Sequence, residues 1–173
     1  PTDGHLRLND DEGWDALRAS EDASVFDDLR YVKINTRPDV IYRGFLFFDT
    51  SVLGDDSEFD NVRLNVFAKC TGDLDDCHLY VLACPTGFPH EPLDSGDCVL
   101  PWDRMTTCAH VDAGSWTELA YRQIALNDPS VLNTSGVTVL CLVERRDYEN
   151  APPPDLKSEN EIKLFSSEEG DGY

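Results

Sequence analysis

Residues Ile41–Ser51 read Ile-Tyr-Arg-Gly-Phe-Leu-Phe-Phe-Asp-Thr-Ser, and a Gly-Asp-Asp sequence follows from Gly54. A nearly unbroken apolar and aromatic run thus ends at polar and turn-forming residues. A short run rich in Phe, Ile and Tyr between turn residues is typical of a strand that is buried on both faces. The sequence therefore predicts such a strand over Val40–Asp49, within a fold built around a β-sheet.

The segment Asn61–Cys70 has the clearest strand pattern, because apolar and polar residues alternate along it. Successive side chains of a strand point to opposite faces, so we expect one face in the core and the other in water. The segment Cys77–Cys84 continues the same apolar phase after a short acidic turn. These two segments are predicted to pair as a hairpin.

Other parts of the chain predict further strands and short helices. His5–Leu8 is expected to be an edge strand, whereas Val137–Val143 is apolar on both faces and is expected at the centre of a sheet. A helix is predicted within Asp11–Ser20, and another of about two turns begins at Asp128-Pro129. The remaining predicted strands are Leu29–Asn35, one or two within Ser115–Leu126, and Glu161–Ser167.

The connections complete the prediction of fold class. Pro85–Trp102 carries four prolines without a regular pattern, and a loop of that length is usually functional or stapled. Short strands joined by Pro- and Gly-rich connections, without an internal repeat, favour a sandwich. We therefore predict an all-β fold: a single antiparallel β-sandwich of jelly-roll type with one or two short helices, forming one domain over residues 1–173.

Several motifs resemble those of a known family. Arg43–Ser51 is similar to the core motif R-x-h-L-x-F-D-h-S (h apolar) of β-sandwich modules called DNRLRE or TGF-propeptide-like domains. Ala19–Val25, Trp116–Leu119 and Phe165–Glu169 are similar to other parts of that pattern, although the usual Asn-Tyr-Gly before the core strand is missing. Such modules occur in secreted polysaccharide-active bacterial proteins, and similar sequences occur in phage virion proteins. The resemblance thus implies a β-sandwich that works outside a cell.

The charge balance limits the partners. The chain has 34 acidic and 14 basic residues, a formal net charge of −20. Nucleic-acid phosphates and anionic membranes both require clustered Lys and Arg, so neither is expected as a partner. The acidity predicts a strongly solvated, self-repelling surface, and adaptation to high salt or binding of divalent cations are alternatives.

The six cysteines predict disulfides. Cys70 and Cys77 flank the turn of the predicted hairpin and share its core face, so a Cys70–Cys77 disulfide is expected. Cys98 and Cys108 are the next plausible pair, Cys84 and Cys141 stay unassigned, and buried free thiols are the alternative. A zinc site is not expected, because no Cys-x-x-Cys and no His-x-x-x-His spacing occurs.

Two further sites are candidates. Asp73, Asp75 and Asp76 place several carboxylates on one turn and could hold a structural Ca²⁺, the one cofactor that we consider, although a solvated acidic turn is the plainer interpretation. An aromatic platform for sugar stacking could be formed by Trp102, Tyr80 and Phe88, for which anchoring of a loop or core is again the plainer role.

No catalytic motif occurs, so the protein is predicted not to be an enzyme. The leading hypothesis is a structural component at a virion surface, a capsid decoration or tail-associated module. A start at Pro1 is expected from removal of an initiator Met, and signal-peptidase cleavage or other processing is the alternative. Pro1–Asn9 is a candidate assembly arm that adds a strand to a neighbour. The expected partners are then copies of itself or other virion proteins. The alternatives are a secreted carbohydrate-binding or adhesion module, with polysaccharide as partner, and a subunit of an extracellular filament.

Overall fold

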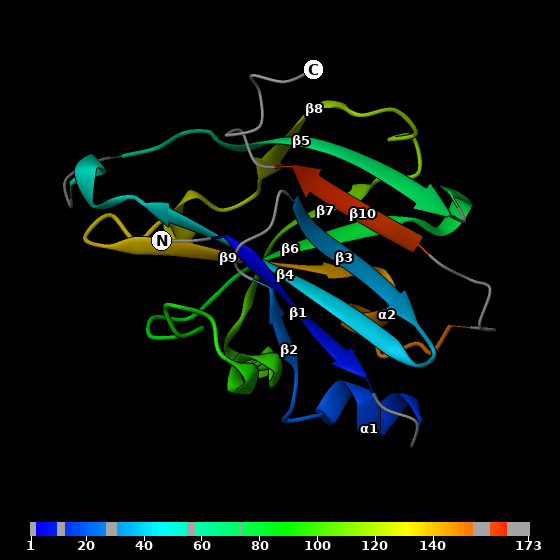
Figure 1. Ribbon diagram of the computed structural model, residues 1–173. Helices are drawn as coiled ribbons and strands as arrows, with labels where there is room; N and C mark the ends of the chain where they lie inside the picture. The colour runs from blue at the N-terminus through cyan, green and yellow to red at the C-terminus, as the bar shows by residue number, and fades with distance from the viewer. Residues whose placement is uncertain are drawn as a thin grey trace.

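The computed structural model describes residues 3–9, 13–26, 31–54, 58–72, 74–153 and 160–165. Antiparallel strands dominate it, accompanied by short helices, so the all-β prediction is confirmed (Figure 1). The jelly-roll connectivity and the single-domain extent stay predictions. The strands are β1 (Gly4–Asn9), β2 (Ser24–Phe26), β3 (Tyr31–Arg37), β4 (Val40–Asp49), β5 (Val62–Gly72), β6 (His78–Ala83), β7 (Thr106–Asp112), β8 (Ala120–Leu126), β9 (Val137–Glu144) and β10 (Asn160–Phe165). The α-helices are α1 (Trp14–Ala19) and α2 (Arg145–Glu149), and 3-10 turns lie at Ser51–Leu53, Leu74–Asp76, Ser95–Cys98, Trp102–Arg104 and Pro129–Val131.

Strand β4 is the point at which the sheet forks. The strand order is β7-β6-β9-β4-β3-β10-β5-β8, and β1 pairs with β4 and with β2. Because β1 occupies one edge of β4 from Val40 to Phe45, β3 and β9 must share the opposite edge. At the fork, a Cβ atom on Gly44 would lie 2.6 Å from the Cγ1 of Val32. The glycine therefore lets β3 cross closely against β4 as the two layers diverge.

The first hydrophobic core lies between the two layers. One layer is formed by β3, β10, β5 and β8, and the other by β9, β6 and β7. The alternation predicted for β5 is confirmed, since Leu64, Val66 and Ala68 are buried while Arg63 and Asn65 are exposed. At the far ends of the two layers β7 lies beside β8, where the backbone N–H of Asn127 donates to the carbonyl of Cys108 at 2.7 Å. The sheet is thus nearly closed.

A second core covers the opposite face of β1, β4, β9 and β6. Helix α1 and the long loop that follows β6 pack onto this face, as Figure 1 shows below β1. Leu17 of α1 is fully buried there, together with Leu6 and Leu8 of β1. The prediction that β4 and β9 are buried on both faces is confirmed, because their alternate residues enter the two cores.

The predicted hairpin of β5 and β6 is wrong. Strand β5 pairs with β10 and β8, whereas β6 pairs with β7 and β9. The connection after β5 is therefore an arch that crosses from one layer to the other. The alternation of apolar and polar residues shows which face of a strand points toward the core. It is the same for two paired strands of one hairpin as for two strands that cover one core from opposite layers, so the sequence alone does not distinguish the two arrangements.

The assembly arm over Pro1–Asn9 stays a prediction, and the described residues of this segment pair within the chain itself. Residues 4–9 form β1, which pairs along its length with β4, and Leu6 and Leu8 are fully buried. His5–Leu8 was likewise expected at a sheet edge, but β2 covers its free side. An apolar strand of this kind belongs to the core, since its withdrawal would expose two leucines.

Sequence reasoning also missed two elements. Neither strand β7 nor helix α2 was predicted. The helix expected from Asp128-Pro129 is only the 3-10 turn Pro129–Val131, with the Asp128 carboxylate accepting from the N–H of Ser130. None of the described helices is long and apolar enough to cross a membrane.

Candidate ligand-binding face

An aromatic row crosses the outer face of the layer β3, β10, β5 and β8. Tyr31, Phe165, Phe67 and Tyr121 stand opposite one another in register, one from each strand, and point away from the first core. Their ring centroids are 5.8, 6.5 and 5.0 Å apart in that order. The ring of Tyr121 is 80% exposed and the other three are half-buried. Cross-strand aromatic pairs stabilise a sheet, but so exposed a terminal ring contributes little of that stability.

A lysine row runs beside the aromatic row. Lys33, Lys163 and Lys69 are in register across β3, β10 and β5, two residues along each strand from the aromatic rings. These are three of the four lysines in the chain. The two rows therefore form one strip of rings and ammonium groups, which we call the open face.

The open face is cationic although the protein is acidic. At the outward positions of its four strands the charged residues are one carboxylate, Glu161, and five cations: Lys33, Arg37, Arg63, Lys69 and Lys163. Arg145 and Arg146, which lie in α2, both pair with Asp76. The face thus has a sign opposite to the net charge of the chain.

Glu161 neutralises part of the lysine row. It forms ion pairs with Lys33 at 2.5 Å and with Lys163 at 2.6 Å. Burial acts to raise the pKa of Glu161, but hydrogen bonds and charge from these two lysines outweigh it and lower the pKa. Among the described carboxylates, none lies within ion-pair distance of Lys69. The ammonium of Lys163 also lies 5.1 Å from the ring centroid of Tyr31, so the contacts with Glu161 and with a tyrosine ring offset part of the repulsion between lysines that stand opposite one another.

The open face continues onto β4 and β1. The ammonium of Lys33 lies 4.2 Å from the ring centroid of Tyr42, and the guanidinium of Arg7 lies 5.8 Å from the same centroid. Next to them His5 stacks on Phe26 at 5.0 Å and accepts a hydrogen bond from the backbone N–H of Lys33 at 3.3 Å. Burial, and then the charge of Lys33, lower the pKa of His5 to about 4.

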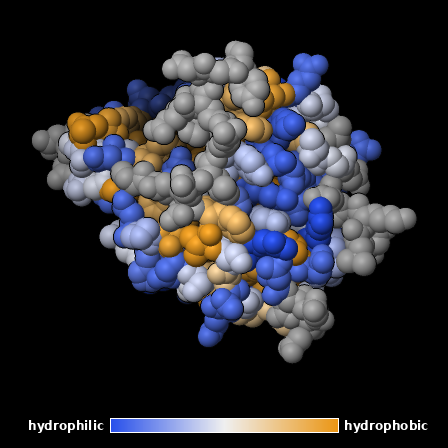
Figure 2. Space-filling model, in the orientation of Figure 1, coloured by the Kyte–Doolittle hydropathy of each residue, from blue (hydrophilic) through white to orange (hydrophobic). Residues whose placement is uncertain are grey.

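This arrangement has the chemistry of a binding surface for an extended ligand. Aromatic faces stack on flat apolar surfaces, and their dispersion contacts do not require a deep pocket. Ammonium groups on flexible stems attract carboxylate, sulfate or phosphate groups. On the view of Figure 2, apolar residues in orange form separate patches among polar residues in blue. The side of the molecule drawn there is thus not one continuous apolar interface.

The aromatic platform predicted from Trp102, Tyr80 and Phe88 is not brought together as one surface. Tyr80 stacks on the ring of Tyr148 at 4.0 Å, and Trp102 meets the edge of that same ring at 6.3 Å. Phe88 packs instead against the buried ring of Phe45. All three belong to the margin of the second core, so the anchoring role that we also considered describes their packing better.

Trp102 covers a buried ionic cluster that joins β4, α1 and α2. Arg43, which is fully buried, donates to both carboxylate oxygens of Asp147 at 2.7 and 2.8 Å. It also donates to the backbone carbonyl of Cys98. Arg18 donates to Asp147 through its side chain at 3.1 Å, and the ring of Trp102 lies over both guanidinium groups. The cluster locks α1 and α2 onto the sheet and has no open side for a ligand.

The calcium prediction does not agree with the surroundings of Asp76. Its carboxylate is already paired with Arg145 and Arg146, and its backbone carbonyl accepts from the side-chain amide of Asn160 at 2.8 Å. Two guanidinium groups supply the positive charge that a Ca²⁺ ion would bring. Asp75 is exposed, and Asp73 lies outside the described residues.

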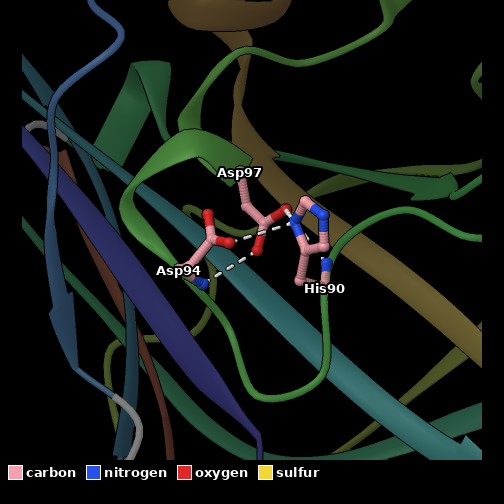
Figure 3. A group of neighbouring side chains, drawn as sticks. All are labelled: His90, Asp94 and Asp97. Carbon is pink, nitrogen blue, oxygen red and sulfur yellow. Dashed lines mark hydrogen bonds and ion pairs between the residues drawn. The ribbon is translucent and has the colours of Figure 1, made fainter.

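A different cluster could hold a metal ion. His90, Asp94 and Asp97 come together in the loop after β6, with the imidazole beside the two carboxylates in Figure 3. The Nδ1 atom of His90 lies 2.8 Å from Asp97 and 3.3 Å from Asp94. The hydrogen bond from His90 to Asp97, followed by the charges of Asp97 and Asp94, raises the pKa of His90.

The buried carboxylate of Asp97 has a structural role in this loop. It accepts the backbone N–H groups of His90 and Asp94, both at 2.9 Å, and so fastens the two ends of the proline-rich turn. All three side chains are thereby explained by closure of the loop, which also contains the cis peptide bonds before Pro89 and Pro92.

The cysteine predictions have mixed outcomes. The Cys70–Cys77 disulfide is confirmed, and it links β5 of one layer to the start of β6 in the other. The Cys98–Cys108 disulfide is wrong, since both thiols are free and lie in different cores. The thiol of Cys98 donates to the carbonyl of Ser20 at 3.0 Å, and that of Cys108 to the carbonyl of Thr106 at 3.3 Å.

The two cysteines that we could not assign lie side by side. Cys84, the first residue after β6, and Cys141 of β9 hydrogen-bond through their side chains at the second core. Burial, and then contact with Cys84, raise the pKa of Cys141 well above its usual value. Cys84 also lines a cavity of about 190 Å³ beneath the loop, together with Phe47, Phe88 and Val139. The Cys141 thiol therefore stays protonated at neutral pH, and both cysteines pack as small apolar groups.

The chain matches no protein-family model, and no curated protein matches it in sequence. The resemblance to DNRLRE-like domains therefore stays a prediction. The structure does account for several residues of that motif: Arg43 forms the buried ion pair, Gly44 lies at the fork, and the Asp49 carboxylate accepts from Ser51 at the end of β4.

Sequence reasoning missed the open face. The alternation along β5 placed Phe67 and Lys69 on the solvent side, but those residues alone are ordinary for an outward face. The rows exist only because β10 inserts between β3 and β5 in a particular register. The available signal was that three of four lysines each lie two residues from an aromatic residue: Lys33 from Tyr31, Lys69 from Phe67, and Lys163 from Phe165.

Proposed function

We propose that this protein is a non-enzymatic extracellular binding module, of the carbohydrate-binding or adhesion type, and that the open face is its recognition surface. The observation that carries the proposal is the aromatic row in register across four strands, with the exposed ring of Tyr121 at its end. Neighbouring rings of the row are tilted against one another by 48°, 67° and 44°, so the ring of Tyr121, the most exposed of the four, is the one that offers its face to a ligand.

Two further observations support an extracellular binding role. The Cys70–Cys77 disulfide is of a kind that persists in oxidising compartments and outside cells. The open face also departs from a protein–protein interface in composition, because lysine is depleted at interface cores. Three half-buried lysines beside the rings fit a polar ligand better than a protein surface.

Retention on polysaccharides tests this proposal. We expect the wild-type protein to be retarded in affinity electrophoresis through gels containing a panel of neutral and acidic polysaccharides, with at least one of them slowing it. Tyr121→Ala should abolish most of that retardation, because it removes the most exposed ring of the row. The matched control is Val52→Ala, which truncates a side chain of similar exposure, 82%, outside the open face.

Unchanged migration of the wild-type protein across the panel would overturn the proposal. It would also fail if Tyr121→Ala and Val52→Ala were retarded equally with the wild type. Circular dichroism of both variants would establish that each is folded.

Assembly into a virion or an extracellular filament is a second proposal, supported by a different surface. Val52 and Leu53 form the tip after β4, where they are 82% and 38% exposed, next to Phe48 at 37%. Neighbouring exposed apolar side chains of this kind are typical of protein contacts. Light scattering tests it: trimers or larger assemblies that dissociate on Val52→Asp would support assembly, and a wild-type monomer would exclude it.

A further inference from the structure

We propose that His78 and His110 form a binding site for one divalent transition-metal ion of the class that imidazole prefers, such as Zn²⁺ or Ni²⁺. The Nδ1 atom of His78 lies 3.3 Å from the Nε2 atom of His110. The pair stands on β6 and β7, in the layer opposite to that of the open face. The inference therefore does not depend on the proposed function.

The register of β6 and β7 brings the two imidazoles together. His78 of β6 stands opposite Asp112 of β7, so His110 is its diagonal neighbour on the same face of the strand pair. Leu79, the next residue of β6, is fully buried in the first core, and the two imidazoles thus lie on the outer side of the layer. His110 is exposed and His78 is half-buried, so an ion from solvent can reach both nitrogens.

The distance between the two nitrogens is that of a chelated ion. Metal–nitrogen bonds of about 2.0–2.1 Å that meet at the tetrahedral angle place their nitrogens about 3.3–3.4 Å apart. The observed 3.3 Å falls in that range and exceeds the roughly 2.7–3.2 Å that is usual for a hydrogen bond from N–H. An ion held here requires His78 to carry its proton on Nε2 and His110 to carry its own on Nδ1. Water would complete the coordination, since no group of three or more ligand atoms among the described residues includes either imidazole.

Stacked aromatic rings hold the imidazole of His110 in place. It lies nearly parallel to the ring of Tyr80, with centroids 4.4 Å apart and planes 14° apart, and Tyr80 stacks in turn on Tyr148 at 4.0 Å and 16°. The hydroxyl of Tyr148 hydrogen-bonds to the side chain of Thr107 on β7 at 2.9 Å. Contacts that orient a ligand raise the affinity for the metal, because less conformational freedom is lost on binding. Tyr80 is thus a positioning residue of the site.

The cluster of His90, Asp94 and Asp97 suits the same ion less well. The Nδ1 atom of His90 already lies 2.8 Å from a carboxylate oxygen of Asp97, and both oxygens of that carboxylate accept backbone N–H groups that close the loop. A metal ion would compete with these bonds. Between His78 and His110 it replaces the hydrogen bond that joins the two rings.

The nitrogen ligands select the class of ion. Imidazole suits zinc, nickel and copper, whereas Ca²⁺ and Mg²⁺ prefer oxygen ligands. The net charge of −20 attracts any cation toward the chain, so charge favours binding and the two nitrogens supply the selectivity. Metal-binding spacing in the sequence gave no sign of this pair, because the two histidines are 32 residues apart.

Titration calorimetry of tag-free protein with Ni²⁺ and with Zn²⁺ tests the site. We expect one ion per chain, and about 1 mM Mg²⁺ should not compete with it. His78→Gln and His110→Gln should each weaken binding at least about tenfold, because losing a ligand costs no less than losing a contact that orients one. His90→Gln is the matched control, since it removes another exposed histidine, in the loop after β6, and it should bind like the wild type.

Variants of Tyr80 test the positioning role. Tyr80→Leu removes the ring on which His110 stacks and should weaken Ni²⁺ binding by about tenfold. Tyr80→Phe keeps the ring and should retain the wild-type affinity. Circular dichroism would establish that each variant is folded. Equal Ni²⁺ affinities of the two folded variants would overturn the positioning role, because a merely structural ring affects stability and not the affinity of the folded protein.

The outcomes distinguish a chelate from other modes of binding. Absence of Ni²⁺ and Zn²⁺ binding by the wild type would overturn the proposal. Loss of binding in His90→Gln, with His78→Gln and His110→Gln unchanged, would overturn it in favour of the loop cluster. A halved stoichiometry in each of the variants His78→Gln and His110→Gln would show two separate contacts and no chelate. Selective broadening by Ni²⁺ of the imidazole ¹⁵N signals of His78 and His110, with the His90 signals retained, would support the site directly.

Discussion

The two sides of the forked sheet use their cations in opposite ways. On the covered side of β1, β4, β9 and β6, the arginines Arg18 and Arg43 converge on Asp147 beneath Trp102. On the open face of β3, β10, β5 and β8, the cations are mainly lysines in a row, with one carboxylate between them. The covered side pairs its charges within a buried cluster, whereas on the open face Lys33 and Lys163 share one partly exposed carboxylate, Glu161.

The side-chain chemistry explains this division. Arginine presents a rigid fork that pairs with a carboxylate through two hydrogen bonds, so it can be buried when its partner is fixed. Burial acts to lower the pKa of Arg43, but the neighbouring Asp147 outweighs it and raises the pKa. Lysine is a strongly hydrated charge on a flexible stem, suited to a surface where an anion is exchanged with water. The comparison teaches that the buried arginines of the covered side stabilise the fold, and under the proposed function the lysines of the open face serve contact with a ligand.

The largest loss of stability is expected from substitutions in the ionic cluster of the covered side. Arg43→Ala should lower the free energy of unfolding by about 3–5 kcal/mol, because it leaves the carboxylate of Asp147 buried with less of its compensation. Asp147→Ala should cost a similar amount, since it strands two guanidinium groups. Urea denaturation monitored by tryptophan fluorescence measures both.

The double variant Arg43→Met/Asp147→Leu distinguishes a buried pair from a loss of packing. It should be less destabilised than either single alanine variant, because neither charge is then left unpaired. Additive losses in the double variant would show that the ion pair is not the source of the effect.

An intermediate effect is expected at His5, where the open face passes onto β1. The unfolded chain binds a proton near the ordinary His pKa of 6.5, whereas the folded protein binds it only near 4. Stability contributed by neutral His5 is therefore complete above pH 6.5 and is lost as the pH falls from 6.5 to 4. The loss should amount to about 2–3 kcal/mol.

Denaturation curves across that pH range, for wild type and His5→Gln, measure this contribution. The difference in unfolding free energy between the two proteins should shrink as the pH falls. A difference that is constant from pH 7 to pH 4 would mean that His5 becomes protonated in the folded protein without cost.

The smallest effect on stability is expected on the open face. Lys69→Gln should raise the free energy of unfolding by about 0.5 kcal/mol at low salt, because it removes repulsion between lysines in register. The gain should disappear in about 1 M salt, where charges are screened over about 3 Å. Destabilisation by Lys69→Gln at low salt would show that the row contributes to the fold, and the contrast between the two sides would be lost.

Much of the fold could be predicted from local pattern. The buried strand Val40–Asp49 was predicted with its observed bounds, because a run of large apolar residues between turn residues has few other uses. The central place of β9 and the Cys70–Cys77 disulfide followed from apolar phase in the same way. The predicted hairpin of β5 and β6 was wrong because the phase of the apolar alternation does not say to which layer a strand belongs.

The candidate site was harder to predict than the fold. Trp102, Tyr80 and Phe88 were chosen because an irregular, proline-rich loop often carries function, yet their rings anchor the second core. Asp76 was chosen as a calcium ligand because it lies in an acidic turn. Its actual partners, Arg145 and Arg146, are about 70 residues away in the sequence and could not be recognised from the turn itself. Neither the packing of these rings nor the ion pairs of Asp76 can be recognised from the composition of the neighbouring sequence.

The sequence by itself determined the elements and their buried faces, since alternation and turn residues act over a few positions along the chain. Only the tertiary structure decided which strands are neighbours, because pairing depends on how two layers diverge at Gly44 and enclose one core. That pairing places β10 between β3 and β5 in register. Lysines and aromatic residues that are scattered along the sequence become two continuous rows because residues opposite one another on paired strands are the nearest neighbours in a sheet.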